Sequence, residues 1–154
     1  PGPLNGRTVG LSWLPTDSRG DDFRECLTAT FPLGDVIERF HQIGIRWEEG
    51  LRQMEQAFGE KISESSQLEL GNARICGAVW KFTEYLFRIY KLKKEWRDSF
   101  LPEYEQWKNE HLKNLENILP CLEKDPRQGF HLEGDFHSFS AERIRQILRS
   151  AQIK

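Results

Sequence analysis

The acidic and histidine side chains with the most suggestive spacing lie in one loop near the carboxyl end of the sequence. His131, Glu133, Asp135 and His137 alternate along the chain, so an extended backbone would place all four on one face. Imidazole and carboxylate ligands together suit zinc or manganese. The alternative is a polar surface loop, because Gly134 interrupts any regular strand. We expect no bound metal or other cofactor, and a small metal-dependent enzyme using residues 131–137 stays open as an alternative.

Other chemical motifs are incomplete. Glu38 and His41 have the Glu-x-x-His spacing of di-iron bundles, but those sites need a second such pair, which the sequence lacks. His41 is therefore expected to be an ordinary residue on a helix face. Cys26, Cys76 and Cys121 are widely spaced and odd in number, which favours buried free thiols over disulfides or a metal site. Nucleophile-elbow, Walker and dinucleotide-binding motifs are missing, so the sequence assigns no catalytic residue.

The stretch Asp125-Pro126-Arg127-Gln128-Gly129-Phe130 is the most motif-like part of the chain. Gly129 permits a positive φ and Pro126 stiffens the backbone before it. Phe130 can insert into a core, and Arg127 can bind helix-end carbonyls or a carboxylate. We therefore predict a structural turn formed by Asp125, Arg127, Gly129 and Phe130.

The spacing of apolar residues indicates the elements that would hold these groups. Intervals of three and four residues predict helices near residues 35–58, 66–100, 102–119 and 140–151. The second is the longest and carries two apolar stripes, which indicates neighbours on two sides. Asp35, Ser66 and Ser140 are the expected N-caps. Pro120 is expected to kink or end the third helix. The predicted fold is all-α, a helical bundle with a long central helix, an irregular N-terminal arm and a short C-terminal helix.

Composition limits the number of domains and the class of partner. The 154 residues suffice for one core, and we divide them into an arm over residues 1–33 and a helical bundle domain over residues 34–154. The apolar residues of the arm are expected to pack on the bundle or on a domain outside this sequence. The net charge of −2 gives no electrostatic reason to expect nucleic acid or an anionic membrane. The chain starts Pro-Gly-Pro and its one methionine is Met54, from which we expect a fragment or a processed product.

Residues 72–150 resemble the C-terminal helical region of large bacterial glycoside-hydrolase-like proteins, of the α-glucuronidase-like and hexosaminidase-like sort. The residues that carry the resemblance are Asn72-Ala73-Arg74, Glu110-His111-Leu112 with Leu115 through Leu119, the turn 125–130, and Ser140-Ala141-Glu142-Arg143-Ile144. The resemblance implies a non-catalytic accessory domain that serves packing, orientation or self-association. Its partner would be the remainder of a larger polypeptide or a homo-oligomer. A free-standing helical interaction module is the alternative.

Overall fold

The computed structural model describes residues 31–59, 62–125, 128 and 139–152, together with two short strands near the amino end. The strands are β1 (Pro3–Leu4) and β2 (Arg7–Thr8), which pair antiparallel with Pro3 opposite Thr8 and Leu4 opposite Arg7. Of the rest of the predicted arm, residues 31–33 are described, and Leu33 is already the first residue of a helix; the remainder lies outside the described residues. The division into an arm and a bundle domain stays a prediction.

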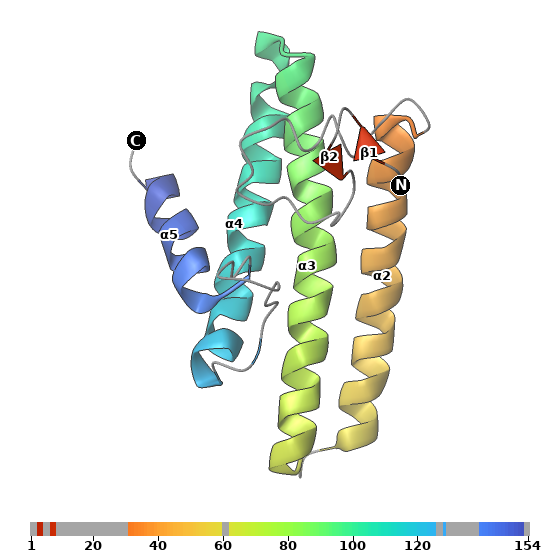
Figure 1. Cartoon of the computed structure of the whole chain (residues 1–154), viewed down its shortest axis with the longest axis vertical. Helices are drawn as coiled ribbons and strands as arrows, with labels where there is room; N and C mark the ends of the chain where they lie inside the picture. Colours follow the sequence, from red (N-terminus) through yellow and green to blue (C-terminus); the bar gives the residue numbers. More distant parts are fainter. Residues whose placement is uncertain are drawn as a thin grey trace.

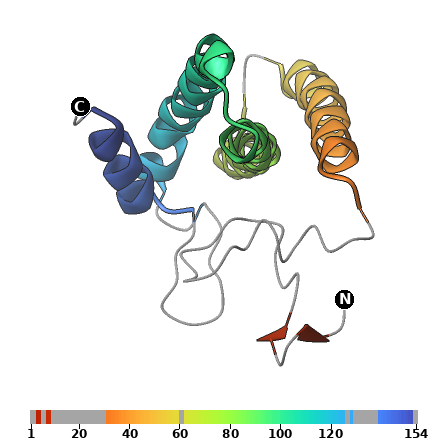
Figure 2. The ribbon, with the colours of Figure 1, turned by 90° about the horizontal axis from the view of Figure 1, so that it is seen from above.

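Four α-helices make up the described bundle, and they confirm the all-α fold with a long central helix. They are α2 (Leu33–Phe58), α3 (Glu64–Lys94), α4 (Leu101–Lys124) and α5 (Ala141–Gln152), with a 3₁₀ turn, η1 (Asp98–Phe100), before α4. Figure 1 shows α3 between α2 and α4, with successive helices running in opposite directions and α5 beside α4. The view along the bundle in Figure 2 gives the same order. None of the described helices combines the length and apolarity that a membrane crossing requires.

Two apolar clusters on α3 confirm that it has neighbours on two sides. The larger joins α3 to α4 and α5, and its buried members are Ile75, Ala78, Val79, Phe82, Leu115, Ile118, Leu122, Phe139 and Ile144. The smaller joins α3 to α2 through Val36, Ile37, Phe40 and Phe87. Phe40 stacks on Phe87 with ring centroids 5.8 Å apart. Burial of both faces makes α3 the structural centre of the bundle.

Close packing of α2 on α3 depends on a glycine. Trp47 donates a hydrogen bond from Nε1 to the carbonyl oxygen of Ala73 at 2.8 Å. Its ring lies where a Cβ on Gly77 would meet Trp47 Cδ1 at 2.7 Å. Only a residue without a Cβ fits there, which explains a glycine inside a helix despite its low helix propensity.

The helix starts differ from prediction at two of three positions. The carbonyl oxygen of Pro32 accepts the amides of Asp35 and Val36, so α2 begins two residues early and Asp35 is not its cap. Asp35 instead lies in the first turn, where a carboxylate complements the helix dipole. Ser63 rather than Ser66 caps α3, because its side chain accepts the Ser66 amide. Ser140 does cap α5 by accepting the amide of Arg143.

The helix ends also correct two expectations. The central helix stops at Lys94 and not at residue 100, because Arg97 is extended and the chain reverses before α4 begins at Leu101, with Pro102 in its first turn. The third helix was predicted to kink or end at Pro120, and an end there is wrong, since α4 continues to Lys124. Burial of Leu122 against α3 stabilises this last turn.

Candidate functional site

A buried carboxylate on α3 is the most chemically distinctive group in the described bundle. The Glu84 side chain is only 5% exposed. Its Oε1 accepts a hydrogen bond from Arg88 Nε at 2.7 Å, one turn further along α3. The same oxygen lies 3.1 Å from His41 Nδ1 on α2. A carboxylate removed from water requires such partners, so this group holds α2 and α3 together.

Aromatic side chains extend this polar cluster to α4. The guanidinium of Arg88 lies 4.3 Å from the ring centre of Trp107, a cation–π contact. Tyr85 stacks on the same Trp107 at 5.8 Å. Burial, together with the negative charge of Glu84, raises the pKa of Tyr85 to about 12. The Tyr85 phenol therefore stays protonated at neutral pH, and Arg88 is held between a carboxylate and an indole.

His111 lies in apolar surroundings, against the larger of the two apolar clusters. It lies 4.8 Å from Phe82, ring centre to ring centre. Its Nδ1 has no hydrogen-bond partner among the described residues. Burial lowers the pKa of His111 to about 4. The ring is therefore neutral at pH 7 and serves as part of the core.

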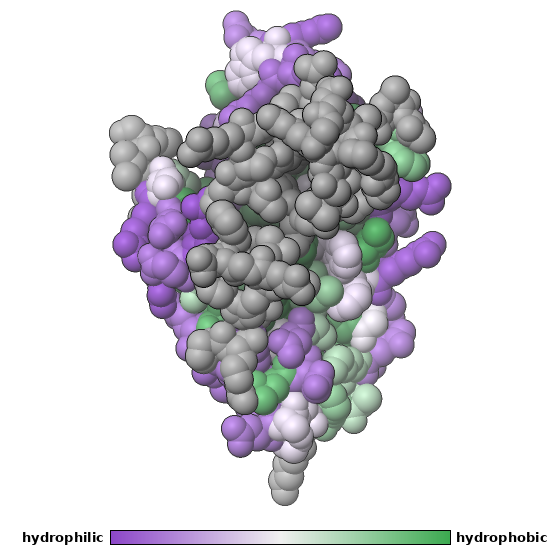
Figure 3. All heavy atoms as spheres, in the orientation of Figure 1, coloured by the Kyte–Doolittle hydropathy of each residue, from purple (hydrophilic) through white to green (hydrophobic). Residues whose placement is uncertain are grey.

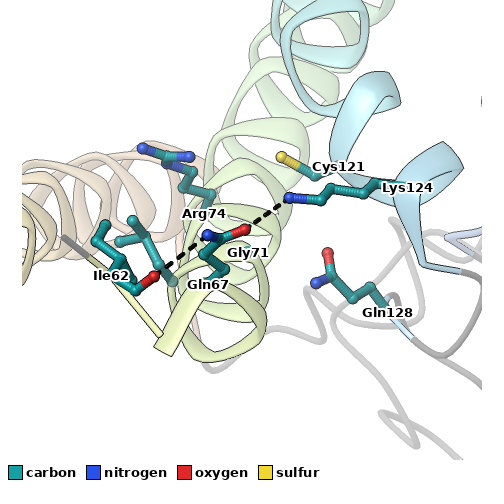
Figure 4. Close-up of a pocket in the computed structure, with 8 residues that line it drawn as sticks. Ile62, Gln67, Gly71, Arg74, Cys121, Lys124 and Gln128 are labelled. Carbon is teal, nitrogen blue, oxygen red and sulfur yellow. Dashed lines mark hydrogen bonds between the residues drawn. The ribbon is translucent and has the colours of Figure 1, made fainter. Parts of the chain in front are cut away.

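A cleft of about 500 Å³ lies where the start of α3 meets the end of α4. Gln67, Leu70, Gly71 and Arg74 recur at intervals of three and four, so they line it from one face of α3. Figure 4 shows Cys121 and Lys124 facing them from α4, with Ile62 and Gln128 at the two sides. The cleft therefore combines a thiol, two cations and two amides.

The Gln128 amide lies directly against the backbone of α3. A Cβ built on Gly71 would lie 2.5 Å from Gln128 Nε2 and 2.7 Å from its Oε1. The side-chain amide of Gln128 therefore occupies the space that the Cβ of any residue other than glycine at position 71 would need. Gln128 is 6% exposed, and its Oε1 has no hydrogen-bond partner among the described residues. A buried acceptor without a partner costs free energy and calls for an explanation.

The two cations of the cleft differ in how they are paired. Arg74 turns toward α2, where its Nη2 lies 2.7 Å from Glu55 Oε1. Lys124 donates to Gln67 Oε1 at 2.8 Å, and within the described chain no carboxylate pairs with it. Gln67 in turn donates to the carbonyl oxygen of Ile62 at 3.4 Å. Both cations keep unused N–H donors, but only the charge of Arg74 is paired with a carboxylate in the described chain, so Lys124 is the cation available to an anionic ligand.

The residues singled out from the sequence are only partly described. Asp125 is buried, and its backbone carbonyl oxygen accepts a hydrogen bond from the backbone N–H of Gln128 at 3.0 Å. The other turn residues, Arg127, Gly129 and Phe130, lie outside the described residues. So do the loop candidates His131, Glu133, Asp135 and His137. The structural turn and the metal-binding alternative both stay predictions.

The remaining candidates have definite positions. His41 contacts Glu84 rather than Glu38, which instead accepts a hydrogen bond from Gln42 at 2.8 Å. Cys76 and Cys121 are free and partly buried, and Cys26 lies outside the described residues. Burial raises the pKa of Cys76. Over the described ranges, no three His, Cys, Asp or Glu side chains gather as a metal site would require.

Sequence reasoning missed Glu84, Gly71 and Gln128. Glu84 and Arg88 have the i, i+4 spacing of a helical ion pair, on a helix that is apolar on two faces. Gly71 and Gly77 inside a helix signal close approach by another group. Gln128 gave no signal, because its role depends on Gly71, which lies 57 residues away in the sequence.

No family model, curated protein or solved structure matches this chain.

Proposed function

We propose that this chain is a non-catalytic helical domain that docks onto the remainder of a larger, carbohydrate-active-type polypeptide. The docking surface is the turn between α3 and α4, residues 95–101, which we call the α3–α4 turn. The carbohydrate-active context is supported by the sequence resemblance of residues 72–150. The docking role is supported by the side chains that the turn exposes.

The observation that carries the docking role is the exposure of two large apolar side chains within this turn. Trp96 is 45% exposed and Leu101 is 51% exposed. Figure 1 shows that this end of α3 and α4 projects beyond the neighbouring ends of α2 and α5. In Figure 3 the same end combines hydrophilic side chains with less polar ones. Tryptophan at such a position is the residue type that most often dominates a protein interface.

The exposed rings are held in place by their neighbours. Trp96 packs edge-to-face on Tyr104 with centroids 5.7 Å apart. Lys93 lies over Tyr104 at 5.6 Å, and Arg97 lies over Phe100 at 5.9 Å. A surface that is already ordered loses little conformational entropy on binding, which favours its use as an interface.

The contacts of the acidic and basic groups at the centre of the bundle support a structural role for these groups. Glu84 is bound to both His41 and Arg88, and Arg88 is covered by Trp107. These contacts join three helices, and both His41 and Arg88 bind the same carboxylate oxygen, Oε1. We therefore place the working surface of the domain at the α3–α4 turn and not at this cluster.

The experiment compares Trp96→Ser and Leu101→Ser with Ile45→Ser, which removes an equally exposed isoleucine from α2. The 154-residue chain is mixed with the rest of the polypeptide encoded by its full gene, and association is followed by sedimentation velocity. We expect the Trp96 change to weaken binding by roughly 30-fold, about 2 kcal/mol, as for an interface hot spot. Ile45→Ser should leave it unchanged.

Three results would count against the proposal. Equal weakening by Ile45→Ser would show that exposure alone, and not the α3–α4 turn, decides binding. Association of the chain with itself through this turn would make the partner a second copy. Absence of any association with the rest of the polypeptide would favour a free-standing interaction module.

A further inference from the structure

The cleft at the start of α3 offers an acceptor and a donor that the described protein leaves unused. The acceptor is Gln128 Oε1, which belongs to a buried side chain and has no hydrogen-bond partner among the described residues. The donor is the Lys124 ammonium, which gives one hydrogen bond to Gln67 and has two N–H groups left. Figure 4 shows the Gln128 carbonyl pointing toward the side of the cleft on which Lys124 lies.

The rest of the cleft fixes the position of this amide. Gly71 leaves room for the amide plane against α3, since a Cβ there would come within 2.9 Å of all three amide atoms. The backbone amide of Gln128 is tied to the carbonyl oxygen of Asp125 at 3.0 Å. The unused acceptor is therefore held at a fixed place and not on a free surface side chain.

A complementary ligand must present an anionic acceptor to Lys124 and a hydrogen-bond donor to Gln128. We propose that this cleft binds a small carboxylate that carries a hydroxyl or an ammonium group on the adjacent carbon. The carboxylate binds Lys124, and the hydroxyl or ammonium donates to Gln128 Oε1. The volume of about 500 Å³ leaves room for substituents on the ligand. This inference is independent of the docking role proposed for the α3–α4 turn.

Three probes of equal carbon number isolate the group that Gln128 recognises. L-lactate, L-alanine and propionate share a three-carbon carboxylate and differ in bearing a hydroxyl, an ammonium or only hydrogen on the adjacent carbon. Each is titrated into the ¹⁵N-labelled 154-residue chain, and the Gly71 backbone amide is followed by NMR. We expect saturable shifts, with lactate or alanine binding about tenfold tighter than propionate, the size of one hydrogen bond.

Single substitutions then separate the two contacts. Gln128→Leu should remove the preference over propionate, whereas Lys124→Gln should weaken all three probes by about tenfold. Lys113→Gln removes the same charge from an exposed position on α4 and should change nothing. A preference for lactate over alanine, or the reverse, identifies the donor as a hydroxyl or an ammonium.

Several outcomes would overturn the proposal. If propionate bound as tightly as lactate and alanine, Gln128 would not recognise the group on the adjacent carbon. If Lys113→Gln weakened binding as much as Lys124→Gln, the effect would be one of general charge. No shift with any probe, together with increased stability in Gln128→Leu, would show a merely strained amide. Lys124 is exposed, so Lys124→Gln should fold and gives a test even where Gln128→Leu does not.

Discussion

Two side chains show how the described bundle uses polar groups at the scale of single residues. The buried Glu84 carboxylate binds His41 and Arg88 through one oxygen, and burial lowers the pKa of His111 so that its ring stays neutral. Both groups have types that often act in catalysis, and in this bundle both contribute to packing between helices. Each role leads to a measurable effect on stability.

Truncation of Glu84 should be strongly destabilising. Glu84→Ala leaves Arg88 and His41 without their shared partner, and we expect a loss of about 3 kcal/mol in the free energy of unfolding. The matched control is Glu49→Ala, which removes an exposed pair with Arg52 and should cost less than about 1 kcal/mol. Urea denaturation measures both. Similar losses in the two variants would contradict the structural role of Glu84.

His111 should make stability depend on pH in the acidic range. Its pKa falls from 6.5 to about 4 on folding, so the unfolded chain binds the extra proton between these values. Stability should therefore be complete above pH 6.5 and decrease as pH falls toward 4, by about 3 kcal/mol at most. In urea denaturation at pH 7, 6 and 5, His111→Leu should show a smaller decrease. An identical pH profile for both proteins would exclude this origin.

Two glycines test the packing of α2 on α3 at the scale of elements. Gly77→Ala places a methyl group against Trp47 and should cost about 1–3 kcal/mol through overpacking. Gly50→Ala, in the exposed middle of α2, meets nothing within 4 Å and should stabilise the protein by about 0.5–1 kcal/mol. Thermal melting of the two variants should shift in opposite directions, and shifts of the same sign would contradict the Trp47 contact.

The sequence predicted the elements well because apolar spacing depends on local chemistry. Ile75, Val79 and Phe82 on one stripe and Phe87 on the other predicted the two neighbours of α3. The same periodicity failed at Trp96, which continues the stripe in sequence although α3 ends at Lys94. Pairing distant partners was beyond such reasoning, because Glu84 with His41 and Gly71 with Gln128 meet only through the arrangement of whole helices.

At the scale of the whole molecule, the described helices form a packed centre and an exposed end, for which we propose different roles. α3 binds α2 through one face and α4 through another. Beyond the packed part, the α3–α4 turn presents Trp96 and Leu101 to solvent. We propose that the centre provides stability and that this turn provides binding.

The most direct test of this division compares Glu84→Gln with Trp96→Ser in the same association assay. Sedimentation velocity with the rest of the polypeptide is measured well below the melting temperature of both variants. We expect Glu84→Gln to be less stable yet to bind like the unaltered chain. Trp96→Ser should keep its stability and lose binding. The reverse pattern, with binding lost in Glu84→Gln and retained in Trp96→Ser, would contradict the account.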